Sequence, residues 1–386
     1  MNSSAGIPQG AAIAINDMLD HCAKIQPGQE VLILAYLDGL YGGDNLVDRE
    51  ALAWIQTAIR LRGARATLLW ADEVAKLHHW RFPPIVKGAM KASDIMINNT
   101  LDLAFEEIVE FKNFTWNEKK LFVRNFATTA PLLCSNWAQT PQELVNEIRY
   151  QSALLVKPGE VFLLTAENGT ILEGQILPAF QPDHPWFTSY AVRREESGYY
   201  RPWPEWVHPP IRVANTQGIF IFDRMLSWWS RYIGISPYFT QPIRLTIKNN
   251  QINKIEGGDE AEALKAFLNS LHTRLGENVF NFNALHFGVH PQAAVGPDQC
   301  PNVLYRRLIE HSHTSNIHVH VGAPEATPDY PYWAHITGDI RTATFKVGDS
   351  LIHDRGYLTT LDHPAVKAIA AKYPGRPGLE PAPRQF

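Results

Sequence analysis

The sequence predicts an α/β domain followed by a β-rich α+β domain, and three observations support this. The first 150 or so residues alternate strand-like apolar runs with helical patterns. After Lys157-Pro158-Gly159 the pattern changes to paired strands joined by turn-forming residues. Seven of the fifteen histidines fall between positions 286 and 335. We therefore expect domains at 1–155 and 156–374, and a Pro/Gly-rich tail at 375–386 that is mobile or wrapped on a neighbour.

The first domain is predicted to contain a small parallel sheet covered by helices. Apolar runs typical of buried strands lie at 31–34, 66–70, 95–97 and 121–123. Between the first two, Asp48 is in position to cap a helix that ends at Gly63. The capping-box pattern at 140–143 predicts a further helix, with Pro141 at its first position. Neither a Gly-x-Gly-x-x-Gly fingerprint nor a Walker-type loop occurs, so we do not expect a dinucleotide site.

The second domain is predicted to be largely antiparallel. One hairpin is expected to pair 161–165 with 170–172, and another to pair 245–248 with 252–255. A single clear helix interrupts the strands, because apolar residues from Leu264 onward recur at helical spacing until Gly276.

Composition limits the classes of partner. The 386 residues are 45% hydrophobic and 19% charged, which is typical of a globular protein with a substantial core. A net charge of −4 without a long basic run argues against nucleic acid and anionic membrane surfaces. No apolar run is long enough to span a membrane, and the three distant cysteines fit a reducing compartment. We therefore expect a cytoplasmic protein with a small-molecule substrate.

The histidines of the second half are the strongest chemical signal. In the run from Asn316 to Val321, strict alternation puts His318 and His320 on one face of a strand. Neutral imidazole is the commonest metal ligand, and its pKa suits proton transfer near neutral pH. The alternative is a structural or solvated strand face for any single histidine. His311 and His313 are the weakest candidates, because their polar surroundings indicate a loop.

Aromatic residues are concentrated between Trp186 and Trp206. Core packing or an oligomer contact is the simplest interpretation of this segment. The alternative is a pocket that stacks on a substrate ring, with Trp203 and Trp206 as its walls.

Segments of the second half match a known family in order and spacing: 257–264, 287–293, 316–322, 334–336 and a closing hairpin around 347–349. They resemble 2,5-dihydroxypyridine 5,6-dioxygenase, which shares a superfamily with the thermophilic leucyl aminopeptidases. The resemblance covers most of the second half and, more faintly, the α/β beginning. It implies an α/β N-terminal domain, a β-rich metal-binding C-terminal domain and a homo-oligomer.

The resemblance also implies a metal site. The dioxygenases hold one Fe(II) with two histidines and an aspartate, the last two in a His-x-Asp motif, and place further histidines over the substrate. Here His335 matches, whereas Ala284 and Thr337 stand where the other histidine and the aspartate are expected. The substrate-side histidines fall near Ala104 and Pro202.

The aminopeptidases of the same superfamily use two metals and several carboxylates. The resemblance aligns one of their glutamates with Glu205 and a histidine with His318. The glutamate that they would place at Ala284 is missing.

New histidines stand close to the missing ligands, which predicts a relocated site. His286 lies two residues after Ala284, hence on the same strand face. The predicted metal ligands are His286, His335 and either His318 or His320. Two further residues are candidates: Asp339 as a substitute carboxylate or as the group that fixes an imidazole tautomer, and His290 as a substrate contact. A salt bridge from Asp339 to a neighbour such as Arg341 is the structural alternative.

Four functions remain open at this point. The leading one is a mononuclear Fe(II) oxygenase that acts on a hydroxylated aromatic or similar chelating substrate, with His320 moving a proton. The second is a metal-dependent hydrolase with zinc and Glu205 as general base. The third is a decayed homologue that serves as a binding or scaffold subunit without metal. The fourth is metal-free acid/base catalysis by the same histidines.

Overall fold

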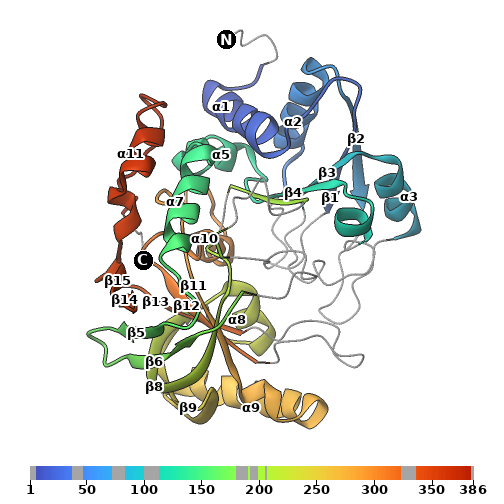
Figure 1. The fold of residues 1–386 in the computed structure, drawn as a ribbon. Coiled ribbons are helices and arrows are strands. Elements are labelled where there is room, and N and C mark those ends of the chain that lie inside the picture. The colour runs from blue at the N-terminus through green and yellow to red at the C-terminus, as the bar shows by residue number, and fades with distance from the viewer. Residues whose placement is uncertain are drawn as a thin grey trace.

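The protein combines a smaller parallel sheet with a larger, mainly antiparallel one (Figure 1). The computed structural model describes residues 6–36, 47–71, 83–99, 113–179, 190–191, 199–204, 207–322 and 336–383. Five residues named in the sequence analysis lie outside these ranges, namely Ala104, Trp186, Glu205, Trp206 and His335. In the described part of the chain, no helix is both long and apolar enough to cross a membrane.

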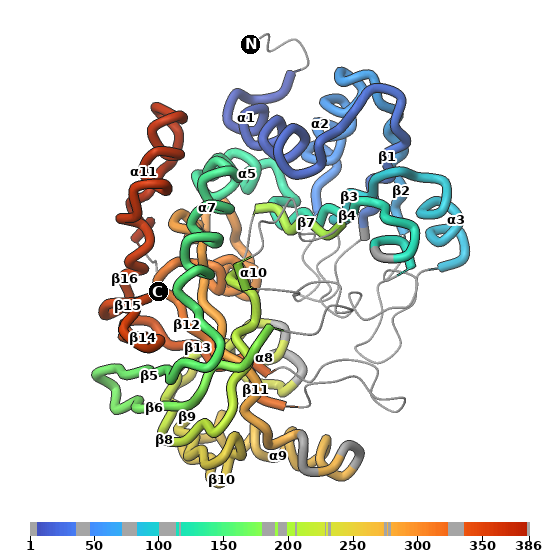
Figure 2. Tube along the Cα trace, in the orientation of Figure 1, coloured from blue at the N-terminus to red at the C-terminus, as the bar shows by residue number. Residues whose placement is uncertain are grey.

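The first sheet contains five described strands, all parallel, in the order β2-β1-β3-β4-β7. The bounds are β1 Glu30–Tyr36, β2 Arg65–Ala71, β3 Ile95–Asn99, β4 Leu121–Asn125 and β7 Tyr200–Trp203. The first four confirm the predicted strands, whose continuous apolar runs suit a sheet covered on both faces. β7 comes from beyond the predicted boundary at 155/156 and pairs with β4, so the chain returns to this sheet (Figure 2).

The helices of the first half are α1 Gln9–Asp17, α2 Arg49–Leu61, α3 Pro84–Ala92, α5 Ala130–Leu133, α6 Asn136–Gln139 and α7 Gln142–Leu154, with π-helical turns at Met18–Cys22 and Asn113–Asn117. Of these, α2 and α3 pack on the parallel sheet. The Asp48 cap is confirmed, because its side chain accepts a hydrogen bond from the backbone N–H of Ala51 at 2.6 Å. The helix predicted from the pattern at 140–143 is present as α7, but the predicted capping box does not form. Pro141 is itself the N-cap of α7, and the N–H of Gln142 instead donates to Asp17 at 2.8 Å.

The second sheet has eleven described strands. Their bounds are β5 Val161–Thr165, β6 Ile171–Ile176, β8 Ile211–Met225, β9 Tyr238–Lys248, β10 Gln251–Glu256, β11 Phe282–Phe287, β12 Ile317–Val321, β13 Ile336–Ile340, β14 Thr344–Val347, β15 Ser350–Asp354 and β16 Tyr357–Leu358. Both predicted hairpins are confirmed. The long strand β8 pairs with β11 near its start and with β13 near its end. Because β12 joins β11 to β13, these four strands close into a ring of pairings.

The helices of the second half are α8 Ser227–Ile233, α9 Asp259–Leu275, α10 Val303–Glu310 and α11 Pro364–Ala370, with 3₁₀ turns at Glu277–Phe280 and Thr359–Asp362. α9 was expected and stops at Gly276, whose φ of 81° suits glycine. α10 was not expected. It begins at Asn302, whose side chain accepts from the N–H of Tyr305, and the hydroxyl of Tyr305 donates to the carbonyl of Phe126 after β4. α10 therefore joins the two halves of the molecule.

The described part of the tail, up to residue 383, packs against other parts of the same chain. The N–H of Ala382 donates to the carbonyl of Pro291 at 2.8 Å, and the ring of His313 hydrogen-bonds to the carbonyl of Ala382 at 3.0 Å. Arg376 pairs with the buried Asp17 at 3.3 Å and donates to the carbonyl of Gln139. The described tail thus packs across both halves of its own chain, whereas its composition predicted a segment that is mobile or wrapped on a neighbour.

Candidate metal centre

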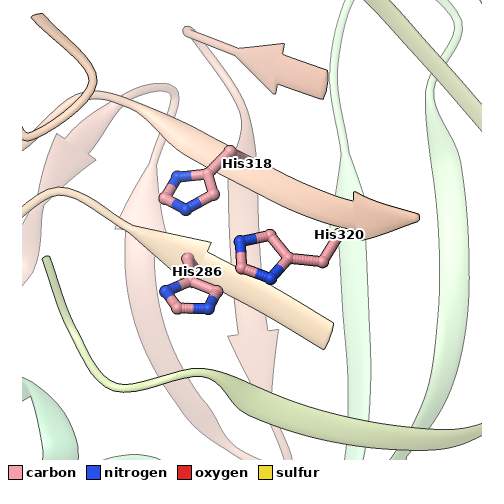
Figure 3. A group of neighbouring side chains, drawn as sticks. All are labelled: His286, His318 and His320. Carbon is pink, nitrogen blue, oxygen red and sulfur yellow. The ribbon is translucent and has the colours of Figure 1, made fainter. Parts of the chain in front are cut away.

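Strands β11 and β12 carry three histidines on one face. The alternation in β12 sends His318 and His320 to the same side, as predicted. The antiparallel register places His286 of β11 directly opposite His318 and Ala284 opposite His320. Because opposite residues of an antiparallel pair share a face, the three imidazoles lie next to one another (Figure 3).

The three rings form a compact buried stack. The ring centroids of His286 and His320 are 4.1 Å apart, and the ring of His318 is 4.8 Å from that of His286. One nitrogen from each ring lies within 4.8 Å of the others, and no side chain is more than 8% exposed. Three nitrogens on one ion at about 2.1 Å would be about 3.4 Å apart, so small side-chain rotations would complete a metal site.

The tautomer of His286 also fits a metal ligand. Its Nδ1 lies 3.1 Å from the backbone carbonyl oxygen of His208. A carbonyl can only accept, so Nδ1 carries the proton and Nε2 keeps the lone pair. Metal-bound histidines commonly donate their other N–H to a carbonyl in this way.

His320 lies between the two positions at which the resemblance lost its ligands. Its partner on β11 is Ala284, and its partner on β13 is Thr337. The hydroxyl of Thr337 accepts a hydrogen bond from the N–H of Leu226 at 3.0 Å. The missing histidine and aspartate would therefore have flanked the new imidazole on the same face.

Asp339 is held inside the protein by three donors. The ring of His311 and the amide of Asn316 each contact its Oδ2 at 2.9 Å, and Arg307 forms a salt bridge to the same oxygen. Burial alone would raise the pKa of Asp339, but Arg307 and His311 outweigh it and hold this pKa well below its usual value. The salt-bridge partner is thus Arg307, so Asp339 does form the salt bridge to a neighbour that the structural alternative expected, with Arg307 as that neighbour.

His311, one of the two weakest candidates in the sequence, lies next to the three clustered histidines. It is the C-cap of α10, and its ring centroid lies 3.8 Å from that of His318. A helix predicted after Asn302 would have revealed this position. Arg307 and His311 are four residues apart, so they lie on the same face of such a helix. This helix was not recognised, so the residues that hold Asp339 were missed.

The predicted substrate contacts that can be located are buried. Trp203 ends β7 with no exposed surface. His290 is fully buried beside Trp137, and its Nδ1 accepts a hydrogen bond from the N–H of Gln292 at 3.2 Å. A substrate role for either residue stays a prediction, as do the roles of Glu205, Trp206 and His335.

Buried histidines should make the fold sensitive to acid. Burial lowers the pKa of His290 to about 3 and that of His353 to about 4. The unfolded chain takes up these protons near pH 6.5, so stability is complete above pH 6.5 and falls as the pH drops toward 4. We expect a loss of about 2 kcal/mol per histidine at pH 5, measured by urea unfolding.

Two variants check this expectation. His353→Gln should flatten the dependence of the unfolding free energy on pH, whereas removal of the exposed His21 should leave it unchanged. Equal unfolding free energies of the wild type at pH 7 and pH 5 would contradict the prediction.

Two solved structures are similar in fold to this chain. The chain is similar to 2,5-dihydroxypyridine dioxygenase from Pseudomonas putida KT2440, with a TM-score of 0.64 and 13% identity, over 91% of this chain and 98% of that one. It is also similar to wild-type AmpT from Thermus thermophilus, with a TM-score of 0.51 and 10% identity, over 90% of this chain and 98% of that one. No family model and no curated sequence matches. The resemblance found in the sequence is therefore confirmed for the fold.

Proposed function

We propose that this chain is a mononuclear metalloenzyme, a non-haem Fe(II) oxygenase that acts on a small hydroxylated aromatic or a similar chelating substrate. The observation that carries the proposal is the convergence of three buried imidazoles with nitrogens within 4.8 Å of one another. Buried histidines without a metal would repel each other on protonation, whereas a shared cation turns their proximity into binding energy.

We assign His286, His318 and His320 to the metal. We take both His318 and His320 as ligands, and not only one of them, because the rings of both lie close to the ring of His286. With His320 as a metal ligand, its predicted role in proton transfer is given up, because the nitrogen that holds the metal cannot also carry a proton. His335 lies outside the described residues and remains a candidate for a further position.

The chain's own residues would prepare the site for a chelating substrate. Three imidazole ligands leave coordination positions open, and their burial keeps bulk water away from the ring that enters. The carbonyl of His208 fixes the ring of His286 with Nε2 toward the site. When bound there, Fe(II) would supply the electrons that allow a hydroxylated ring to react with O₂.

A two-metal hydrolase has less support. A second metal needs bridging carboxylates. On this face of the described strands the carboxylate is Asp339, whose Oδ2 is already held by Arg307, His311 and Asn316. A hydrolase at this site would therefore use a single zinc ion, with Glu205 as the predicted general base.

Metal analysis tests the proposal directly. Protein purified anaerobically without an affinity histidine tag is expected to contain about one iron per chain and to consume O₂ with hydroxylated aromatics. One zinc per chain and hydrolysis of peptides would favour the hydrolase instead. A protein that takes up neither iron nor zinc on reconstitution would contradict both enzyme functions and favour a scaffold or metal-free role.

A further inference from the structure

The histidine face continues across two more strands to a buried arginine. The register places His318 opposite Asp339, and Asp339 opposite Arg224 of β8. Together with His286 these residues form one row across β11, β12, β13 and β8. Neighbouring strands lie about 4.8 Å apart, so the backbone of Arg224 is about 10 Å from that of His318.

Arg224 has unused donor capacity in this row. Its side chain is 6% exposed and binds Asp223 through Nε and Nη2, at 2.8 and 3.0 Å. Its guanidinium carbon lies 5.6 Å from the ring centroid of Tyr238. Its Nη1 is buried and makes no hydrogen bond with any described residue. A buried donor without an acceptor is costly, so an anion that reached it would gain a charge-assisted hydrogen bond.

The charges around this row also favour an anion. The three imidazoles are neutral when they bind a metal, and Thr337 brings no charge at the place where an aspartate was expected. Asp339 is already compensated by Arg307. Burial, Arg224 and Arg307 lower the pKa of Arg341, whereas Asp223 and Glu310 raise it, so the fixed charges around Arg341 are of both signs. A divalent ion would add positive charge, and the complement of such a centre is a negatively charged substrate.

We propose that the substrate is an aromatic carboxylate, whose ring hydroxyls chelate the metal and whose carboxylate is received by Nη1 of Arg224. The inference rests on the proposed metal centre and narrows its substrate class. Arg224 would then fix the orientation of the ring, because a chelating end and an anionic end allow one placement across the row.

A matched pair of probes tests this inference. We would measure the binding of 3,4-dihydroxybenzoate and of its uncharged amide to the Fe(II)-loaded protein by anaerobic calorimetry. Both probes carry the same two hydroxyls, and they differ in the charge of the other end. The acid is expected to bind at least about tenfold more tightly than the amide, since a charge-assisted hydrogen bond is at stake.

Two variants test whether Arg224 is the residue that makes the acid bind more tightly than the amide. In Arg224→Gln the acid and the amide should bind within about twofold of each other, whereas Arg244→Gln should keep the wild-type ratio. Arg244 is a suitable control because it pairs with Glu256 at 3.0 Å on the partly exposed edge formed by β9 and β10. The ratio in the wild type tests the inference even in the case that Arg224→Gln does not fold.

The possible failures are distinguishable. Equal binding of acid and amide to wild-type protein that holds iron would overturn the carboxylate subsite and leave the metal centre intact. Binding of neither probe to that protein would also overturn it. A wild-type protein that takes up no metal would overturn the oxygenase proposal together with this inference.

Discussion

His318→Ala is expected to lower the affinity of the protein for Fe(II) or Zn(II) by more than about 100-fold, because it removes one of the three ligands. His318 faces His286 across the β11–β12 register and lies on the same strand face as His320. Two imidazoles alone do not hold a divalent ion against a competing chelator. Metal content after dialysis, and a competitive titration with a coloured chelator, measure the change.

A matched variant separates ligand loss from a general effect of removing histidine. His21→Ala changes an exposed imidazole in the first half of the chain and should retain the metal. His286→Ala should lose it as His318→Ala does. A folded His318→Ala protein that keeps one metal ion per chain would show that the ion is held elsewhere.

Arg307→Met is expected to lower the free energy of unfolding by about 3–5 kcal/mol at pH 7, since it leaves Asp339 as a buried charge without its cation. Arg307 is 1% exposed and Asp339 is completely buried. The remaining partners, His311 and Asn316, donate hydrogen bonds but do not replace the permanent charge. Urea unfolding at neutral pH measures the difference.

Two further variants test whether the loss of stability comes from the unpaired charge of Asp339. Arg244→Met breaks a partly exposed ion pair and should cost no more than about 1 kcal/mol. The double variant Arg307→Met with Asp339→Leu should recover much of the lost stability, because apolar residues replace the whole pair. If Arg307→Met costs less than 1 kcal/mol, the pair does not carry the charge of Asp339 in the way its geometry indicates.

The acid dependence of this ion pair has a defined sign. The pKa of Asp339 is lowered in the folded protein relative to the unfolded chain. Its contribution to stability is therefore complete above the unfolded pKa near 3.9 and is lost as the pH falls through the folded value. The buried histidines act at higher pH, so acid should first titrate His290 and His353 and only later Asp339.

Local patterns predicted much of the fold. Runs of apolar residues identified β1 to β4, because a strand covered on both faces needs an apolar side chain at nearly every position. Turn residues identified the hairpins around Asn168-Gly169 and Asn249-Asn250, where both asparagines of the second turn have positive φ angles. Alternation in β12 predicted that His318 and His320 share a face. Each of these features depends on neighbours a few residues away.

The sequence by itself determined many of the elements and the shared strand face of His318 and His320, whereas the tertiary structure decided which residues meet. His286 joins His318 through a register between strands some thirty residues apart, and Arg224 enters the same row from a strand more than a hundred residues before Asp339. The N–H of Gln142 at the start of α7 likewise finds its acceptor on the distant Asp17. Register and long-range ion pairs depend on how buried surfaces fit together across the whole chain, and local periodicity carries no information about that fit.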